Sequence, residues 1–129
     1  MSEIHGTVYW NELNTRDVEA AKAYYGAICG WSFDTMPMPD GQGDYVVGKL
    51  GDQMVGGMFD MTGMPGMDQV PPHWLTYFGV DDVDAATKAT AENGGTVIRE
   101  PFDVTGVGRI AIVQDASGAA IGLMTPSDS

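Results

Sequence analysis

Three side chains of this 129-residue chain are candidates for acid–base chemistry or polar recognition: Glu12, Tyr77 and His73. A carboxylate on the inward face of a strand loses hydration, so Glu12 is a candidate general base or a fixed negative charge for a cationic ligand. Tyr77 stands 65 positions after Glu12 (77 − 12), and a phenol facing a carboxylate would form a hydrogen bond with it. His73 is a third proton-transfer candidate, although its place after two prolines also suits a residue at the rim of a site.

Glu12 also has a structural interpretation that the sequence leaves open. The carboxylate would then pair with Arg109 or with a backbone donor and hold two parts of the fold together. Arg109 in turn would contact either an anionic ligand group or an acidic neighbour, and the surplus of carboxylates favours the neighbour. Structural pairing, ligand contact and catalysis therefore remain three roles for Glu12.

The 65-residue spacing recurs along the chain and predicts the elements that position these side chains. Asp17–Ala21 reads Asp-Val-Glu-Ala-Ala and Asp82–Ala86 reads Asp-Val-Asp-Ala-Ala, while Gly30 is matched by Gly95. A repeat of this size predicts two similar modules that complete each other's core, with the ligand site where they meet.

Each half of the sequence shows one strand, one helix and three strands. The apolar spacing predicts helices at Arg16–Cys29 and Asp82–Glu92. Thr15 or Asp17 can cap the first helix, Gly30 can end it, and the second helix is expected to end at Gly94–Gly95. Alternating and branched residues predict the strands Val8–Thr15, Trp31–Met36, Asp44–Leu50, Gln53–Asp60, Trp74–Val80, Thr96–Arg99, Gly108–Gln114 and Ala119–Thr125. We therefore expect one α+β domain over 1–129: a βαβββ module at about 4–60, a Gly- and Pro-rich linker at 61–72, and a second module at about 73–126.

Composition limits the partners that this chain would meet. Eighteen Asp and Glu against six Lys and Arg give a net charge of −12, which repels phosphate backbones and argues against nucleic-acid binding. No stretch is apolar enough for a membrane span, and the first residues lack the pattern of a secretory signal. With the single cysteine Cys29, expected to be a buried small hydrophobe, these features predict a cytoplasmic protein.

The repeated modules resemble the vicinal oxygen chelate superfamily, which includes glyoxalase I, bleomycin-resistance proteins and extradiol dioxygenases. The opening Trp10–Asp17 and the ending Gln114–Leu123 are similar to an uncharacterised glyoxalase-like branch, and the resemblance covers nearly the whole chain. It implies a pseudo-twofold arrangement of the two modules, with a ligand cleft between curved mixed sheets and helices packed outside. It also implies a small-molecule ligand and, in many relatives, a homodimer.

The resemblance implies four metal-ligand positions in members that use a metal, two on each module. In this sequence those positions fall on Trp10, Gly57, Leu75 and Gly122. None of these side chains can coordinate a divalent cation, which needs His nitrogens, carboxylate oxygens or thiolates. We therefore expect neither a metal nor another cofactor in this chain.

Strand alternation starting from those four positions gives the expected lining of the cleft. It consists of Trp10, Glu12, Phe59, Leu75, Tyr77 and Met124. Apolar and aromatic groups with one carboxylate suit a small, partly aromatic molecule, with a cation favoured over a phosphorylated metabolite. The methionines at 54, 58, 61, 64 and 67 would either fill an uneven core or form a pliable wall over the site.

Three functions follow from this interpretation. The first is a metal-free binding protein that resembles the drug-sequestering bleomycin-resistance members. The second is a metal-independent isomerase or lyase that uses Glu12, Tyr77 or His73 as acid and base, and the third is a metal-dependent glyoxalase or dioxygenase with atypical ligands. The sequence favours the first and leaves open whether any reaction is catalysed.

Overall fold

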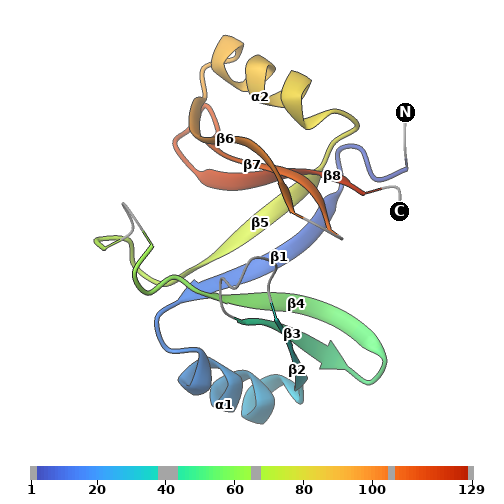
Figure 1. Ribbon diagram of the computed structural model, residues 1–129, viewed down its shortest axis with the longest axis vertical. Coiled ribbons are helices and arrows are strands. Elements are labelled where there is room, and N and C mark those ends of the chain that lie inside the picture. Colours follow the sequence, from blue (N-terminus) through green and yellow to red (C-terminus); the bar gives the residue numbers. More distant parts are fainter. Residues whose placement is uncertain (1–2, 38–43, 65–67, 105–106, 128–129) are drawn as a thin grey trace. The chain divides into compact units, whose positions relative to one another are not determined.

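The computed structural model describes residues 3–37, 44–64, 68–104 and 107–127, and its elements follow the predicted order (Figure 1). Two helices and eight strands form two βαβββ modules, which confirms the α+β fold class. Neither helix is long and apolar enough to cross a membrane. The elements are β1 (Val8–Thr15), α1 (Val18–Cys29), β2 (Ser32–Pro37), β3 (Asp44–Leu50), β4 (Gln53–Asp60), β5 (His73–Gly79), α2 (Val83–Glu92), β6 (Thr96–Val104), β7 (Gly108–Gln114) and β8 (Ala120–Pro126).

The chain divides into two compact units. One unit is Trp10–Trp74, and the other combines Met1–Tyr9 with Leu75–Ser129. In the unit Trp10–Trp74 the strand order is β2-β3-β4-β1, with β1 parallel to β4 and the other neighbours antiparallel. Its core consists of Leu13, Val46 and Met58, which bury their side chains against α1 and the residues that follow it. One face of these strands is therefore covered by the helix.

The second unit repeats this arrangement with the strand order β5-β8-β7-β6, in which only β5 and β8 run parallel. Val83 and Thr87 of α2 are buried, and so are Ala111 and Val113 of β7. Thr125 of β8 accepts a hydrogen bond from the Val83 amide (3.1 Å) and donates one to the Val80 carbonyl (2.8 Å), which attaches the start of α2 to its strands.

Both helices start at the aspartates that the repeat singled out. Asp17 accepts a hydrogen bond from the Ala20 amide (3.0 Å), and Asp82 accepts one from the Ala85 amide (3.1 Å). Because a cap residue is not helical, α1 begins at Val18 and not at Arg16. The left-handed Gly30 (φ 74°) ends α1 as predicted.

Strand β6 is longer than the predicted Thr96–Arg99. Its pairing with β7 shifts register between Val97 and Arg99 and again between Arg99 and Phe102. These irregularities let the strand continue past Pro101, which cannot donate to a regular ladder. The Arg99 guanidinium lies 3.7 Å from the centre of the Phe102 ring.

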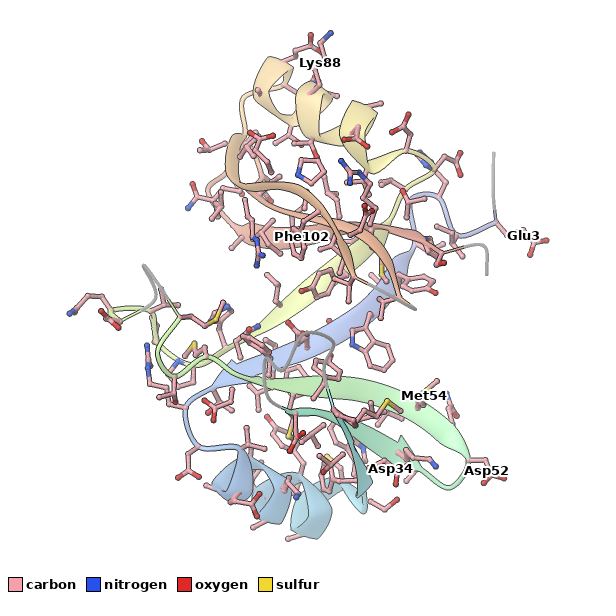
Figure 2. The ribbon with its side chains drawn as sticks, viewed as in Figure 1. Glu3, Asp34, Asp52, Met54, Lys88 and Phe102 are labelled. Carbon is pink, nitrogen blue, oxygen red and sulfur yellow. The ribbon has the colours of Figure 1, made fainter. Side chains whose placement is uncertain are left out.

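The sulfur-containing residues divide between core and surface. Cys29 is exposed, so its predicted burial is wrong, because α1 turns its last residues to solvent. Met58 and Met61 are buried and fill the core, whereas Met54 is exposed beside the β3–β4 turn (Figure 2). Met67 lies outside the described residues.

Loss of the Asp17 cap is expected to lower the free energy of unfolding. Asp17→Ala removes the acceptor for the Ala20 amide and should cost about 1 kcal/mol. Asp17→Asn keeps an acceptor and should restore most of that loss, and urea denaturation followed by circular dichroism measures both variants. Equal stability of Asp17→Ala and wild type would contradict the role of Asp17 as a cap.

Candidate functional site

The face of β1 and β4 that points away from α1 carries the predicted residues Trp10, Glu12 and Phe59. Register pairs Glu12 with Gly57, while Leu13 and Met58 on the opposite face are buried against α1. Glu12 and Trp10 are partly buried. The structure therefore places a carboxylate directly opposite a glycine on this face.

A chain of hydrogen bonds links Trp10, Tyr45 and Glu12. The Trp10 indole Nε1 donates to the Tyr45 hydroxyl oxygen (3.0 Å), and the Tyr45 hydroxyl is hydrogen-bonded to Glu12. Burial raises the pKa of Tyr45 far above its ordinary value of 10.0, and the negative charge of Glu12 raises it further, against a smaller opposing effect of Trp10. The phenol therefore stays protonated and donates to the carboxylate.

Gly57 makes room for the ring of Tyr45. A side chain at position 57 would overlap the phenol ring and its hydroxyl. The space that this glycine leaves is occupied by a tyrosine from β3, so it is not open floor for a ligand. This close approach explains why the neighbouring strand carries glycine at this position.

The second module repeats the packing without the polar chain. Register pairs Tyr77 with Gly122, and a side chain at position 122 would overlap the Tyr77 ring. The counterpart of Tyr45 is Ile110 (110 − 45 = 65), which carries no polar group. The predicted lining residues Leu75, Tyr77 and Met124 are all buried, so in this unit the corresponding face is mainly apolar.

Tyr45 is the site residue that sequence reasoning missed. The phenol expected to face Glu12 was Tyr77, but the hydroxyl that the structure shows bonded to Glu12 belongs to Tyr45. Tyr45 has no repeat counterpart of similar type, so the 65-residue comparison could not select it. A usable signal was present, because strand alternation puts Tyr45 and Val47 on one face of β3 and Val47 pairs with Gly57.

His73 and Arg109 are held by local partners. The Nδ1 atom of His73 lies 2.8 Å from the Pro71 carbonyl oxygen, and because that oxygen can only accept, Nδ1 is the donor in this hydrogen bond. Arg109 donates to Asp84 (2.8 and 3.0 Å) and to Asp103 (3.2 Å), and the bonds to Asp84 lower the pKa of that carboxyl. The prediction that Arg109 contacts acidic neighbours is therefore confirmed.

The four positions that the resemblance implies for metal ligands carry no metal-binding side chain in this sequence. Trp10, Gly57, Leu75 and Gly122 supply no donor atom of a suitable kind. Within residues 3–37, 44–64, 68–104 and 107–127, no three His, Cys, Asp or Glu side chains gather where they could hold a metal ion.

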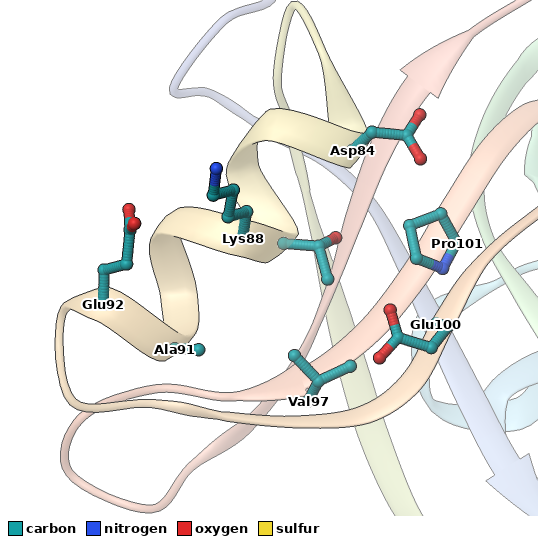
Figure 3. Close-up of a pocket in the computed structure, with 8 residues that line it drawn as sticks. Asp84, Lys88, Ala91, Glu92, Val97, Glu100 and Pro101 are labelled. Carbon is teal, nitrogen blue, oxygen red and sulfur yellow. The ribbon is translucent and has the colours of Figure 1, made fainter.

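A shallow pocket of about 460 Å³ lies between α2 and β6, outside the predicted set (Figure 3). In Figure 3, Ala91 of the helix lies on one side of the pocket and Val97 and Pro101 of the strand lie on the other, while the side chain of Lys88 is directed away from the strand. The pocket is open, and carboxylates form part of its lining. One of them, Asp84, already accepts a hydrogen bond from Arg109. Its lining residues are Asp84, Thr87, Lys88, Ala91, Glu92, Val97, Glu100 and Pro101.

Gly57→Ala should destabilise the protein through Tyr45. The added methyl group forces the ring away from its place and breaks the bond from Trp10, which we expect to cost about 1 to 3 kcal/mol. With Tyr45→Ala in the background, the same substitution should cost much less. Urea denaturation of the two single variants and the double variant measures the coupling, and additive costs would contradict this packing.

The protonated state of Tyr45 should be visible in the pH dependence of stability. The pKa of Tyr45 is raised in the folded state, so its contribution is complete below pH 10 and is lost as the pH rises above that value. Tyr45→Phe should therefore flatten the fall in unfolding free energy above pH 10. Ultraviolet titration of the five tyrosines should show one fewer late-ionising phenol in the folded variant than in the folded wild type. An unchanged late step would exclude Tyr45 as its source.

The sequence profile of the Glyoxalase/Bleomycin resistance protein/Dioxygenase superfamily matches residues 6–123. The chain is 43% identical over 122 residues to the protein named "Putative glyoxylase CFP32" of Mycobacterium tuberculosis (strain CDC 1551 / Oshkosh), covering 95% of this chain and 45% of that protein. It is 34% identical over 125 residues to "Anthracycline biosynthesis protein DnrV" of Streptomyces peucetius, covering 89% of this chain and 45% of that protein. The chain thus spans less than half the length of these curated relatives.

Solved structures share the fold at low identity. Methylmalonyl-CoA epimerase from Mycobacterium tuberculosis superposes with a TM-score of 0.66 at 18% identity, covering 98% of this chain and 93% of that one. The Mn(II)-bound glyoxalase from Novosphingobium aromaticivorans gives a TM-score of 0.55 at 15% identity, covering 90% of this chain and 37% of that one. The profile match and the identity to the curated relatives show that the chain belongs to the glyoxalase/bleomycin resistance protein/dioxygenase superfamily.

Proposed function

We propose that this domain binds a small, partly aromatic, cationic molecule on the face that carries Trp10, Tyr45 and Glu12, without a metal. The observation that carries the proposal is the hydrogen-bonded chain of these three side chains. It combines two aromatic groups with one carboxylate, the combination that recognises an aromatic cation.

The Tyr45 bond prepares Glu12 for this role. A carboxylate accepts several hydrogen bonds, and the donor from Tyr45 helps to fix the orientation of Glu12. A preoriented carboxylate loses less entropy when it contacts a ligand cation, and a charge-assisted bond is stronger than a neutral one. Glu12 would therefore be the polar anchor, with the Trp10 ring as the apolar contact beside it.

The protonation of Tyr45 favours binding over catalysis. A general base must be without its proton at the working pH in order to accept one, whereas burial and the Glu12 charge raise the pKa of Tyr45 away from neutrality and keep its phenol protonated. Binding therefore agrees with the chemistry of these side chains better than an isomerase or lyase reaction does.

The curated relatives suggest a ligand class. One relative is named for anthracycline biosynthesis, and anthracyclines are planar polycyclic aromatic molecules, many with a protonated amino sugar. Such a molecule would offer a flat ring to Trp10 and a cation to Glu12. Cytoplasmic residence of this binding protein stays a prediction from the sequence.

Glu12→Gln should weaken binding of a cationic aromatic molecule specifically. The probe is an anthracycline with a protonated amino sugar, compared with its uncharged N-acetyl form, titrated by fluorescence with and without chelator. We expect Glu12→Gln to cost about 1 to 3 kcal/mol for the cation and little for the neutral form, with chelator changing neither value.

Glu19→Gln is the matched control, because Glu19 is an exposed carboxylate on α1. It should bind both probes as wild type does. Equal affinity of Glu12→Gln and wild type for the cation, with the fold intact by circular dichroism, would assign Glu12 a structural role. Affinity that chelator abolishes would refute the metal-free proposal.

A further inference from the structure

The turn after helix α2 has the sequence Asn-Gly-Gly, at Asn93, Gly94 and Gly95. Asn93 is the C-cap of the helix, with φ −110° and ψ 23°, and Gly94 follows in a left-handed conformation (φ 92°). The turn leads from Glu92 at the end of the helix to Val97 of β6 (Figure 3). Asn93 and Gly94 are both exposed, so water reaches the side-chain amide and the peptide bond beside it.

An asparagine that is followed by glycine has a chemical instability of its own. The backbone nitrogen of the glycine can attack the side-chain carbonyl carbon of the asparagine and close a cyclic imide. Glycine has no Cβ, so nothing beside this nitrogen hinders the attack, whereas a larger residue in that place does. Asparagine is accordingly one of the thermolabile residues of proteins.

The Gly94 nitrogen is available as the nucleophile. The amides on either side of it are bonded to α2, since Asn93 donates to the Ala89 carbonyl (2.9 Å) and Gly95 donates to the Thr90 carbonyl (2.9 Å). Within the described residues, the Gly94 amide donates to no backbone carbonyl. It therefore loses no such hydrogen bond when it attacks.

The Asn93 side chain is held in place by an exposed hydrogen bond. Its Nδ2 atom donates to the Ala89 carbonyl (2.8 Å), which keeps the side-chain amide over the last helical turn. Rotation about the side-chain bonds breaks this contact and frees Cγ to approach the Gly94 nitrogen. Because one exposed bond at a fraying helix end opposes the reaction, folding should slow it only about five- to tenfold relative to the unfolded chain.

The repeat shows that a helix of this fold can end without the reactive pair. At the 65-residue offset, Asn93 and Gly94 correspond to Ile28 and Cys29 at the end of α1. Neither side chain has a carbonyl group that could close the ring. Gly30 still ends that helix in the left-handed conformation (φ 74°), so the architecture itself does not require Asn-Gly here.

We propose that Asn93 is a site of spontaneous deamidation and that this modification loosens the end of α2. The Gly94 nitrogen gives up its proton and bonds to Asn93 Cγ, while the Cγ–Nδ2 bond breaks and Nδ2 leaves as ammonia with that proton. Water then adds to either carbonyl carbon of the imide and opens the ring. Position 93 becomes aspartate or isoaspartate, without an oxidant, a reductant or a second protein. This inference does not depend on the proposed ligand.

The products disturb the helix end through charge and chain length. The new carboxylate cannot donate to Ala89, and it lies at the negative end of the helix dipole, next to Glu92. Isoaspartate also places an extra carbon in the backbone of the turn. That turn is tight, because even a Cβ at Gly95 would overlap the Gln114 carbonyl. Both products should therefore detach the last turn of α2 from its neighbours.

Peptide mapping by mass spectrometry tests the reaction in the folded protein. After incubation at physiological temperature and mildly alkaline pH, the Asn93 peptide should give two products, each with the mass change of NH2 replaced by OH. Peptides with Asn11 and Asn14 are internal controls, because these residues precede Glu12 and Thr15 within β1. They should stay unmodified, and unfolding in urea should speed conversion of Asn93 about five- to tenfold.

Asn93→Gln is the matched control variant, because it keeps an amide but would have to close a larger ring. Circular dichroism melts should show that wild type loses melting temperature as it ages, whereas Asn93→Gln does not. Fresh Asn93→Asp, which carries one of the products, should melt about 2 to 5 °C below fresh wild type. Unmodified Asn93 in the aged folded protein, equal conversion of Asn11 or Asn14, or an Asn93→Asp melt equal to that of wild type would each overturn the proposal.

Discussion

Parallel pairing of the first and last strand of each module is the constraint on which the candidate site depends. It puts Glu12 opposite Gly57 in one unit and Tyr77 opposite Gly122 in the other. Each glycine then receives an aromatic ring, because a side chain there would overlap it. The same backbone arrangement therefore builds two sites of related shape, and only the side chains decide their chemistry.

The two modules have diverged in chemistry while keeping this geometry. One carries the Trp10–Tyr45–Glu12 chain, whereas the other buries Leu75 and Met124 beside Tyr77 and has Ile110 where Tyr45 would stand. The helices differ in the opposite sense, since α1 exposes apolar residues and α2 exposes polar ones. A repeated fold thus supports polar side chains on one module without a duplicate on the other.

Membership of the superfamily shows the scaffold, and the residues of this chain limit what the scaffold can do. Epimerase and glyoxalase structures share the fold at identities below 20%. Here the four positions that the resemblance implies for metal ligands carry Trp, Leu and two Gly. The chemistry available on this scaffold therefore depends on local side chains such as Glu12 and Tyr45 and not on the fold.

The sequence by itself determined the order of the elements and the glycine that ends α1, and it offered Thr15 or Asp17 as the cap of that helix. These features depend on local spacing and residue type, which are visible without coordinates. Tertiary structure decided that Tyr45 bonds to Glu12, that β6 continues past Pro101, and that α1 leaves Ile28 and Cys29 exposed. Each of these features depends on the contacts of a side chain with residues distant in sequence, or on its exposure to solvent. Strand register and helix packing set those contacts only when the chain folds.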